Sequence, residues 1–524
     1  MLTFAAVDIG SNSCRLAIAR VQQHRLKTLL EDREVTRLGE SVFETGMISP
    51  EAMANTIKAL KRFQKAVQTH ACDQVRVVAT SATRDARNSE DFRAWVKSAT
   101  GWTVDVISGL EEGRLIHLGV STLEPGGMQR CLLVDLGGGS CEVTVSEAGR
   151  IRQMVSMPLG AVRLQQEFLR TDPPAKDDTA RLRQFIEREL VRAEKKLGKP
   201  RVQHVIATSG TAAALAEASE YLLDSSTKKR LRTLKTGTPG KKGRVLYAEA
   251  AAVRTLADKL LKMTNAERAQ VPGIGPRRSE IIAGGAQVYA RLLERLELKG
   301  FRYSPLGLRD GMLAQMLADA DVQAKVHRTI EAERWEGVME VCRRYAVDMP
   351  KAEALRAQAE MLFEHLQRVH ELPQEYRLWL ASAAMMQDVG KFMNHQGWHR
   401  HTQYILANSE IFGFSPQQRV VVSAIARYLG KTRPMLEDRV MRSLPVEEHA
   451  HVTRAVVLLR LAAALNSNRT AKQTPPVKVQ VYPKRVVLEL APTRGRGELE
   501  MWALRKETAY FREVFRRELL VEVA

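Results

Sequence analysis

The sequence lacks the cysteine patterns that stabilise small secreted domains or hold structural zinc. Its five cysteines, at positions 14, 72, 131, 141 and 342, are odd in number, and no two of them form a CxxC pair. A disulfide framework and a zinc ribbon are therefore both disfavoured. This usage fits a reducing compartment, and we expect a cytoplasmic location.

Long apolar runs are also missing. The first residues, MLTFAAVDIGSNS, contain no basic segment, and Asp8 interrupts the apolar run before a signal peptide could form. The most apolar later stretch, AVVLLRLAAAL at 455–465, is too short to span a bilayer and contains Arg460. We expect no integral membrane segment, although the charge of the chain leaves peripheral association with the inner membrane face open.

The chain does have length, an ordinary globular balance and a surplus of positive charge. Its 524 residues suggest three or four domains, at roughly 100–200 residues per domain. Hydrophobic residues make up 44% and charged residues 27%, which excludes wholesale disorder. The 80 Lys and Arg residues against 60 Asp and Glu give a net charge of +20. Nucleic acid, a membrane surface or a polyanionic substrate would each explain that surplus.

The pattern along the chain predicts two α/β halves, a helical region and a small C-terminal segment. Apolar strands at 3–9 and 14–21 are joined by a turn rich in Gly and Ser, and the same arrangement recurs from residue 131. From about residue 320 the periodicity is almost entirely helical, and an alternating hairpin then precedes a last helix at 505–518. The predicted domains are 1–124, 125–318, 319–470 and 471–524.

Two turns in these halves have the same construction. DIGSNS begins at Asp8, DLGGGS begins at Asp135, and each follows a buried strand. Glycines let the backbone approach a ligand closely, successive N–H groups can hold phosphate oxygens, and a nearby carboxylate suits Mg²⁺. A tight hairpin with an Asx turn would need only one Gly and one Asp. Two matching turns therefore favour phosphate binding.

These turns resemble the paired phosphate loops of the sugar kinase/actin/heat-shock chaperone superfamily. A closer resemblance is to the exopolyphosphatase/guanosine pentaphosphate phosphohydrolase family, and it covers essentially the whole chain, as in the long bacterial exopolyphosphatases. The resemblance implies two actin-like/ribonuclease H-like α/β domains followed by an all-α HD-like domain and a small α+β C-terminal domain. The segments that carry it, in order, are DIGSNSCR from Asp8, SATRD from Ser81, SGLEEGR from Ser108, DLGGGSCE from Asp135, SGT from Ser209, PLGLRDG from Pro305, WHRH from Trp398, NSNR from Asn466 and TPP from Thr474.

The SGLEEGR segment contains the candidate catalytic residue. Ser108 and Glu111 have the spacing of a capping box, with Ser108 at the N-cap and Glu111 three positions on, which gives Glu111 a structural role. On composition alone both acids could simply favour the helix dipole. The resemblance implies instead that the second glutamate, Glu112, is the base that activates water.

The remaining site residues are predicted around the two turns. We expect Mg²⁺ on Asp135 and Glu142, with Asp8 as a further ligand, and a monovalent cation such as K⁺ is also conceivable. Arg84 is a candidate phosphate clamp, although an exposed helix-start residue is an equal alternative. The predicted substrate-binding residues are Gly10, Ser11, Asn12, Ser13, Arg84, Gly137, Gly138, Gly139, Ser140, Ser209, Gly210 and Thr211.

Basic runs supply a possible guide for a polyanion. Residues 225–244 contain eight Lys or Arg and no acid, which predicts a solvated loop that raises the encounter rate with a polyanion. Solubility alone is the alternative. No aromatic residue interleaves with this run, so base stacking on nucleic acid is not indicated. Arg277 and Arg278 are a second candidate, for which a solvated helix end is the favoured interpretation.

The helical region resembles a metal-dependent HD phosphohydrolase domain in AMMQDVGKF and HQGWHRH. His395, His399 and His401 could in principle bind metal. The His-Asp pair that defines such domains is Gln387-Asp388 here, and an amide is a poor replacement for imidazole. We therefore expect packing, dimerisation or extension of a substrate channel rather than metal chemistry in this region.

The leading hypothesis is an exopolyphosphatase that removes terminal phosphates from inorganic polyphosphate with Mg²⁺ and water. The nearest alternative is hydrolysis of guanosine pentaphosphate by the same chemistry, and the basic run favours the polymer. A kinase, a chaperone-type ATPase and a non-catalytic polyphosphate-binding protein are disfavoured by Glu112. The resemblance also implies a homodimer, and no specific nucleic-acid partner is expected.

Overall fold

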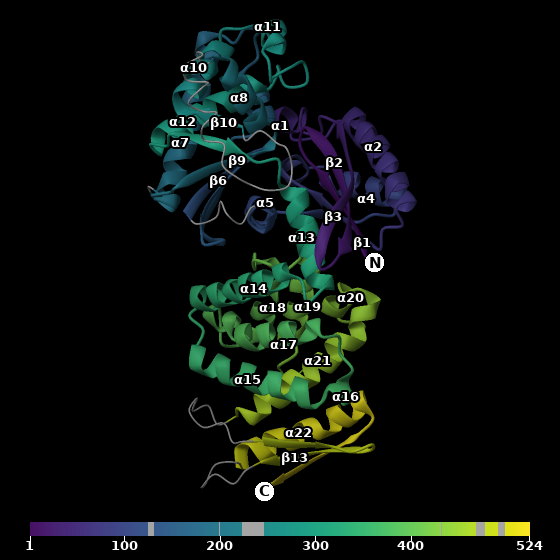
Figure 1. Cartoon of the computed structure of the whole chain (residues 1–524). Coiled ribbons are helices and arrows are strands. Elements are labelled where there is room, and N and C mark those ends of the chain that lie inside the picture. The colour runs from purple at the N-terminus through teal and green to yellow at the C-terminus, as the bar shows by residue number, and fades with distance from the viewer. Residues whose placement is uncertain are drawn as a thin grey trace. The chain divides into compact units, whose positions relative to one another are not determined.

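The structure is a computed structural model that describes residues 1–123, 130–198, 200–222, 246–430, 432–467, 477–490 and 498–523. The chain divides into two compact units, Met1–Thr329 and Ile330–Ala524. Figure 1 shows the chain with its helices and strands labelled. The finer division into four domains remains a prediction, and two of its boundaries, at 124/125 and 470/471, lie outside the described residues.

The first unit contains a five-stranded sheet with the order β3-β2-β1-β4-β5. The first three strands are antiparallel neighbours, whereas β4 and β5 run parallel to β1. Its strands are β1 (Thr3–Ile9), β2 (Ser13–Gln22), β3 (Arg25–Val35), β4 (Gln74–Ala79) and β5 (Val104–Val106).

The second sheet of this unit repeats that plan. Its order is β10-β11-β9-β6-β7-β8, in which β6, β7 and β8 are antiparallel neighbours and β9 and β11 follow β6 in parallel. The shared order and directions confirm that the halves repeat one construction. Its strands are β6 (Arg130–Leu136), β7 (Cys141–Glu147), β8 (Arg150–Met157), β9 (His204–Thr208), β10 (Tyr247–Glu249) and β11 (Gly300–Tyr303).

Helices of the first unit bury apolar faces against the two sheets. In α2, Ser49 accepts a hydrogen bond from Ala52 N at the N-cap and Pro50 occupies the first turn, which fixes the start of the helix. Leu60 and Phe63 of α2 are fully buried in the core of the first sheet. Each such side chain contributes roughly 1.5–3 kcal/mol. The helices are α1 (Val42–Thr45), α2 (Pro50–Thr69), α3 (Ser81–Asp85), α4 (Ser89–Thr100), α5 (Gly109–Leu123), α6 (Ala161–Phe168), α7 (Lys176–Leu197), α8 (Ser209–Leu222), α10 (Ala250–Leu260), α11 (Asn265–Gln270), α12 (Ile282–Arg295) and α13 (Leu308–Ala320).

Helices α5 and α13 cross at two glycines, although they lie far apart in the sequence. A Cβ on Gly311 would lie 1.7 Å from the Leu115 carbonyl oxygen, and one on Gly119 would lie 2.7 Å from Gly311 N. The two backbones are therefore in direct contact, and no larger residue fits without moving a helix. This crossing fixes α5, whose first turn carries Glu111 and Glu112.

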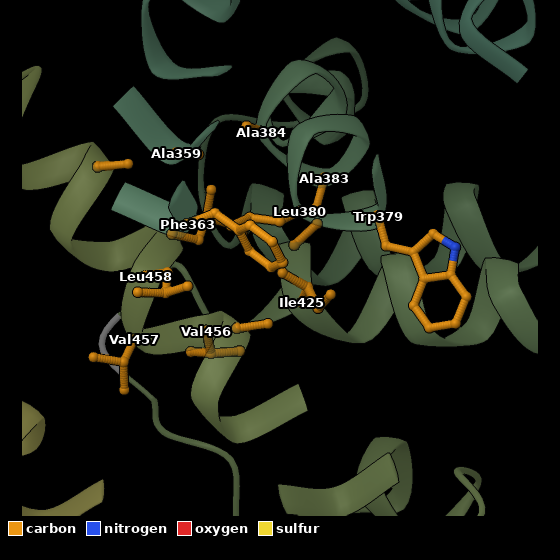
Figure 2. Close-up of a cluster of buried hydrophobic side chains, with 14 of the residues drawn as sticks. Ala359, Phe363, Trp379, Leu380, Ala383, Ala384, Ile425, Val456, Val457 and Leu458 are labelled. Carbon is orange, nitrogen blue, oxygen red and sulfur yellow. The ribbon is translucent and has the colours of Figure 1, made fainter. Parts of the chain in front are cut away.

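The second unit is helical and ends in a small sheet. One apolar cluster joins its helices to the C-terminal strands, since Phe363 and Leu458 belong to the same core as Leu488 and Phe511. Figure 2 shows the part of this cluster around Phe363, Leu380 and Ile425. Its elements are α14 (Lys325–Arg344), α15 (Met349–His365), α16 (Gln367–His370), α17 (Glu375–Met386), η2 (Val389–Phe392), α18 (Trp398–Asn408), α19 (Pro416–Arg427), α20 (Arg439–Arg442), α21 (Val446–Leu465), β12 (Val477–Val481), β13 (Arg485–Leu490), α22 (Glu498–Phe515) and β14 (Glu518–Val523).

The C-terminal elements differ in detail from the prediction. The hairpin forms, with β12 and β13 antiparallel, but a third strand, β14, adds to β13 in parallel. The last helix is α22, which ends at Phe515 rather than at residue 518 because Arg516 adopts a positive φ of 56°. Among the described residues, no helix is both long enough and apolar enough to cross a membrane.

Candidate active site

The two predicted phosphate turns, which follow the central strands β1 and β6, lie against each other. A Cβ on Gly138 would lie 3.0 Å from the Ser11 Cβ and 3.3 Å from Asn12 N, so one turn touches the backbone of the other. They border a cleft of about 470 Å³ within the first unit. The predicted site residues that line this cleft are Asp8, Gly10, Ser11, Asn12, Ser13, Glu112, Asp135, Gly137, Gly138, Gly139, Ser140, Ser209, Gly210 and Thr211.

Three carboxylates converge at this cleft. Asp135, the last residue but one of β6, pairs in register with Glu142 on β7, while Glu112 approaches from the first turn of α5. One oxygen from each of the three lies within 4.8 Å of the others, and all three residues are buried. Of the residues that the structure describes, these form the one cluster of this kind. Such a set of oxygen ligands suits a hard divalent cation.

Glycines allow α5 to bring Glu112 this close. A Cβ on Gly109 would lie 2.1 Å from the Ser156 Oγ, and one on Gly113 would lie 2.6 Å from the Met154 Sδ and 3.4 Å from the Glu142 Cβ. The glycines are one helical turn apart and so present a flat face to β7 and β8. The GLEEG spacing therefore sets the depth at which Glu112 enters the site.

Hydrogen bonds satisfy only part of this cluster. Ser156 Oγ donates to Glu142 Oε1 at 2.7 Å, and Thr208 Oγ1 donates to Asp135 Oδ1. Two of the four remaining oxygens, Glu112 Oε2 and Glu142 Oε2, are buried and have no hydrogen-bond partner. Buried carboxylate oxygens are costly without a partner, so the residues present fit a bound cation.

The pKa shifts of these carboxylates also favour a bound cation. Burial, reinforced by Asp135, raises the pKa of Glu142 to about 8. Burial and the neighbouring Glu142 raise the pKa of Glu112 well above its ordinary value, and burial also raises the pKa values of Asp135 and Asp8. Without a cation the cluster holds protons at neutral pH, and a cation would displace them.

Asp8 lines the cleft but is not one of the clustered three. Burial raises the pKa of Asp8, and the positive charges of Arg15 and Arg309 partly offset that rise. The cluster therefore contains Glu112 together with Asp135 and Glu142, where the sequence suggested Asp8.

The predicted capping box at the start of α5 forms only in part. Ser108 Oγ accepts a hydrogen bond from Glu111 N at 3.1 Å, as expected. The Glu111 carboxylate binds the guanidinium of Arg114 at 2.8 and 2.9 Å, where the capping box would have it reach back to Ser108. Arg114 is 1% exposed and also donates to Gln315 on α13. Glu111 thus has a structural role, as predicted, but through a different partner.

Arg84 lies beside the catalytic candidate and is not among the residues that line the cleft. Its Nη1 donates to the Ile107 carbonyl at 2.7 Å and lies 3.9 Å from Glu112 Oε2. It is partly buried, so the solvent-exposed alternative does not describe it. Its use as a phosphate clamp remains a prediction.

Four arginines line the same cleft, and the sequence had singled out only one of them. Burial and the charges of the surrounding arginines lower the pKa of Arg33 to about 10, which shows how closely they gather. Arg278 packs against Gly210, since a Cβ on Gly210 would lie 1.7 Å from Arg278 Nη1. The interpretation of Arg278 as a solvated helix end is therefore wrong. The four are Arg15, Arg33, Arg278 and Arg309.

Ser209 has a strained backbone at the cleft. Its φ is 71°, unusual for a residue with a side chain, and its Oγ donates to the Leu136 carbonyl at 2.6 Å. Such strain persists where the surroundings enforce it and often marks a functional site.

The second unit gathers different chemistry around its Gln-Asp pair. Asp388 Oδ2 is ion-paired with Lys351 at 3.2 Å and with Lys391, whereas Asp388 Oδ1 is buried and has no hydrogen-bond partner. Gln387 is buried and His395 is exposed. The basic run 225–244 lies outside the described residues.

Comparisons with known proteins find relatives for both parts of the chain. Residues 17–320 match the model of the Ppx/GppA phosphatase family, and residues 334–508 match that of its domain III. A solved family member from Aquifex aeolicus is 30% identical over 61% of this chain and 99% of its own, with a TM-score of 0.49. An exopolyphosphatase from Cytophaga hutchinsonii is 25% identical over 60% of this chain and 97% of its own, with a TM-score of 0.53. An exopolyphosphatase-like protein is 29% identical over 59% and 96%, also with a TM-score of 0.53.

Proposed function

Because the chain belongs to the Ppx/GppA phosphatase family, and so is a hydrolase of phosphoanhydride bonds, we propose that it is an exopolyphosphatase. It would remove the terminal phosphate of inorganic polyphosphate by attack of water. The observation that carries the proposal is one cleft that combines an unpartnered buried carboxylate, two glycine turns and four arginines.

Glu112 is the proposed catalytic residue. Its Oε2 has no hydrogen-bond partner and lies beside the turns that would hold the terminal phosphate, so it can orient a water molecule and accept its proton. The new P–O bond forms as the bridging P–O bond breaks, which leaves orthophosphate and a chain shorter by one unit. Burial raises the pKa of Glu112, whereas the charge of Arg84, 3.9 Å away, favours the ionised form that can accept this proton.

Asp135 and Glu142, with Asp8 as a further ligand, are the proposed ligands of Mg²⁺, and the clustering of Glu112 with the first two supports a cation at this position. When bound, the ion supplies charge neutralisation for the phosphoryl oxygens. Ser156 and Thr208 hold one oxygen of each of the first two carboxylates. N–H groups of residues 11–13 and 138–140 would donate to the oxygens of the terminal phosphate, since those of Gly10 and Gly137 already bond the Ser13 and Ser140 carbonyls. Phosphoryl transfer depends mainly on position and charge stabilisation.

The arginines favour a polyanion that extends beyond one phosphate. Arg15, Arg33, Arg278 and Arg309 supply charge along the cleft, and guanidinium groups bind phosphate oxygens in pairs. Tyr303 is the one aromatic side chain among the described residues that line the cleft, so little surface is available there for stacking a guanine base. These features support polyphosphate over the alternative, guanosine pentaphosphate.

The remaining expectations belong to this proposal. The duplicated sheet order supports an actin-like assignment for the two α/β halves. We propose an HD-like helical domain without metal chemistry of its own, since two lysines hold Asp388. A cytoplasmic homodimer is also proposed, as is the division into four domains.

The deciding experiment measures phosphate release from long-chain polyphosphate and from guanosine pentaphosphate, each with Mg²⁺ and with chelator. We expect Mg²⁺-dependent release, with a higher kcat/KM for the polymer. A higher kcat/KM for guanosine pentaphosphate would select the alternative, and release that is unaffected by chelation would contradict the metal assignment.

A further inference from the structure

Arg163, in the first turn of α6, makes contacts in both α/β halves. Its Nε donates to the Gly139 carbonyl at 2.8 Å, and its Nη2 donates to the Ser81 hydroxyl at 3.3 Å and to Asp85. The guanidinium also lies over the Phe43 ring, 4.1 Å from its centroid. The side chain is 14% exposed and does not line the cleft.

The partners of this guanidinium come from different halves of the unit. Gly139 belongs to the second phosphate turn, whereas Ser81 begins α3 of the first half, and both line the cleft. A Cβ on Gly139 would lie 2.4 Å from the Ser81 Oγ and 2.6 Å from the Phe43 Cζ. The turn is thus pressed against the other half with no space for a side chain, and Arg163 is the cation that joins them.

The bond to Gly139 also orients a phosphate donor. The Gly139 carbonyl and the Ser140 N–H belong to one trans peptide, whose C=O and N–H point in opposite directions. When Arg163 holds the carbonyl, it fixes the direction of that N–H. Ser140 lines the cleft and belongs to the proposed phosphate-binding turn.

Other contacts keep the guanidinium in this position. Nη1 lies 3.5 Å from Glu167, one turn along α6, and Asp85 is partly exposed on the surface of the first half. The planar guanidinium of Arg163 can bind Gly139 and Asp85 at the same time, whereas a lysine ammonium has a single nitrogen and cannot reach both.

We propose that Arg163 is a positioning residue that fixes the 137–140 turn against the first half and thereby sets the affinity of the cleft for a terminal phosphate. The inference rests on the proposed function of that cleft. Since the turn would hold the phosphate before and during reaction, loss of its alignment weakens binding in both states, and KM is affected more than kcat.

The test compares Arg163→Met, Arg163→Lys and Asp85→Asn with the native protein. Binding of inorganic phosphate is measured by calorimetry, and KM and kcat are measured on long-chain polyphosphate. For Arg163→Met we expect Kd and KM to rise by about tenfold, the effect of one hydrogen bond to a charged group, with kcat changed less than about threefold. Arg163→Lys should fall between Arg163→Met and the native protein.

Asp85→Asn removes the charge of one first-half partner of Arg163, leaves the bond to Ser81 in place, and does not alter α6 or the turn. It should raise Kd and KM by a smaller factor, and the double variant should match Arg163→Met, because both changes break one link. Arg152→Met is the matched control, since Arg152 is exposed and pairs with Glu147 on the surface. Its constants should be those of the native protein.

A lower melting temperature with unchanged Kd and KM in the Arg163 and Asp85 variants would overturn the proposal and leave Arg163 a structural residue. If Arg163→Met does not fold, Asp85→Asn alone decides, and native constants for it also overturn the proposal. If the native protein releases no phosphate from polyphosphate, the proposed function fails, while the calorimetric series still decides the role of Arg163.

Discussion

Replacing Glu112 with Gln should abolish most hydrolysis and leave the fold intact. The amide has nearly the same shape but cannot accept a proton from water. A general base contributes roughly 10²–10⁴ in rate, or about 3–5 kcal/mol of activation free energy. Glu142 offers an oxygen within 4.8 Å of the same position and is the obvious substitute base, so the loss should fall in the lower half of this range.

Folding should tolerate this change because Glu112 is electrostatically unfavourable in the native state. It is buried, Glu142 repels its charge, and its Oε2 makes no hydrogen bond. A neutral amide removes that repulsion, so the metal-free variant should be at least as stable as the native protein. The nearby Arg84 keeps its bond to the Ile107 carbonyl.

Glu111→Gln is the matched control on the neighbouring residue. Glu111 binds the buried Arg114 at 2.8 Å, so its loss should lower stability by roughly 1–3 kcal/mol. Its kcat should remain near the native value, since Glu111 is not among the residues that line the cleft. Glu112→Gln should therefore lose phosphate release and keep its melting temperature, whereas Glu111→Gln should keep phosphate release and melt at a lower temperature. Near-native turnover by Glu112→Gln would refute the assignment of the base.

Three further predictions concern charge in and around the cleft. Arg278→Met should raise KM for polyphosphate by roughly tenfold or more. Arg277→Met should leave KM unchanged, because Arg277 is exposed. Gly210→Ala should also raise KM, because the added methyl group would displace the Arg278 guanidinium. In chelator, the free energy of unfolding should fall as pH rises from 4.5 to about 8, because the folded state retains a proton on Glu142 that the unfolded state has lost. The fall should be at most about 1.4 kcal/mol per pH unit. Glu142→Gln or bound Mg²⁺ should flatten this pH dependence, as measured by urea titration. Neutralising the Lys and Arg residues of 225–244 should weaken polyphosphate binding and reduce its salt dependence, and an unchanged salt slope would contradict the guide role.

Sequence reasoning found the residues whose chemistry is local. The DIGSNS and DLGGGS turns and the SGLEEGR segment each contain their signal within a few neighbouring residues, because turn formation and helix capping depend on short-range geometry. All of the predicted turn residues line the cleft, as does Glu112. The repeated strand order followed from the same local pattern.

What the sequence could not supply was the pairing of distant charges. Arg33 carries no local sign of function on an otherwise exposed strand, yet the charge of Arg278 from the other half acts on it. Arg163 has no motif of its own and pairs with Asp85 across the two halves. Glu111 was expected to complete a capping box, but the long-range approach of α13 buries Arg114 and gives Glu111 a stronger partner. Asp8 lines the cleft and stays a predicted ligand, and only the tertiary structure brings Glu112 together with Asp135 and Glu142.

The sequence by itself determined the two glycine turns and the α/β-then-helical order, since these are written in local patterns, whereas the choice of Glu112 over Glu111 came from the family resemblance. Only the tertiary structure decided which carboxylates meet, which arginines face them and what holds the second turn in place. The physical reason is that a buried charge takes its energy from whatever lies within a few ångströms, and at this site those neighbours come from segments that are far apart along the chain.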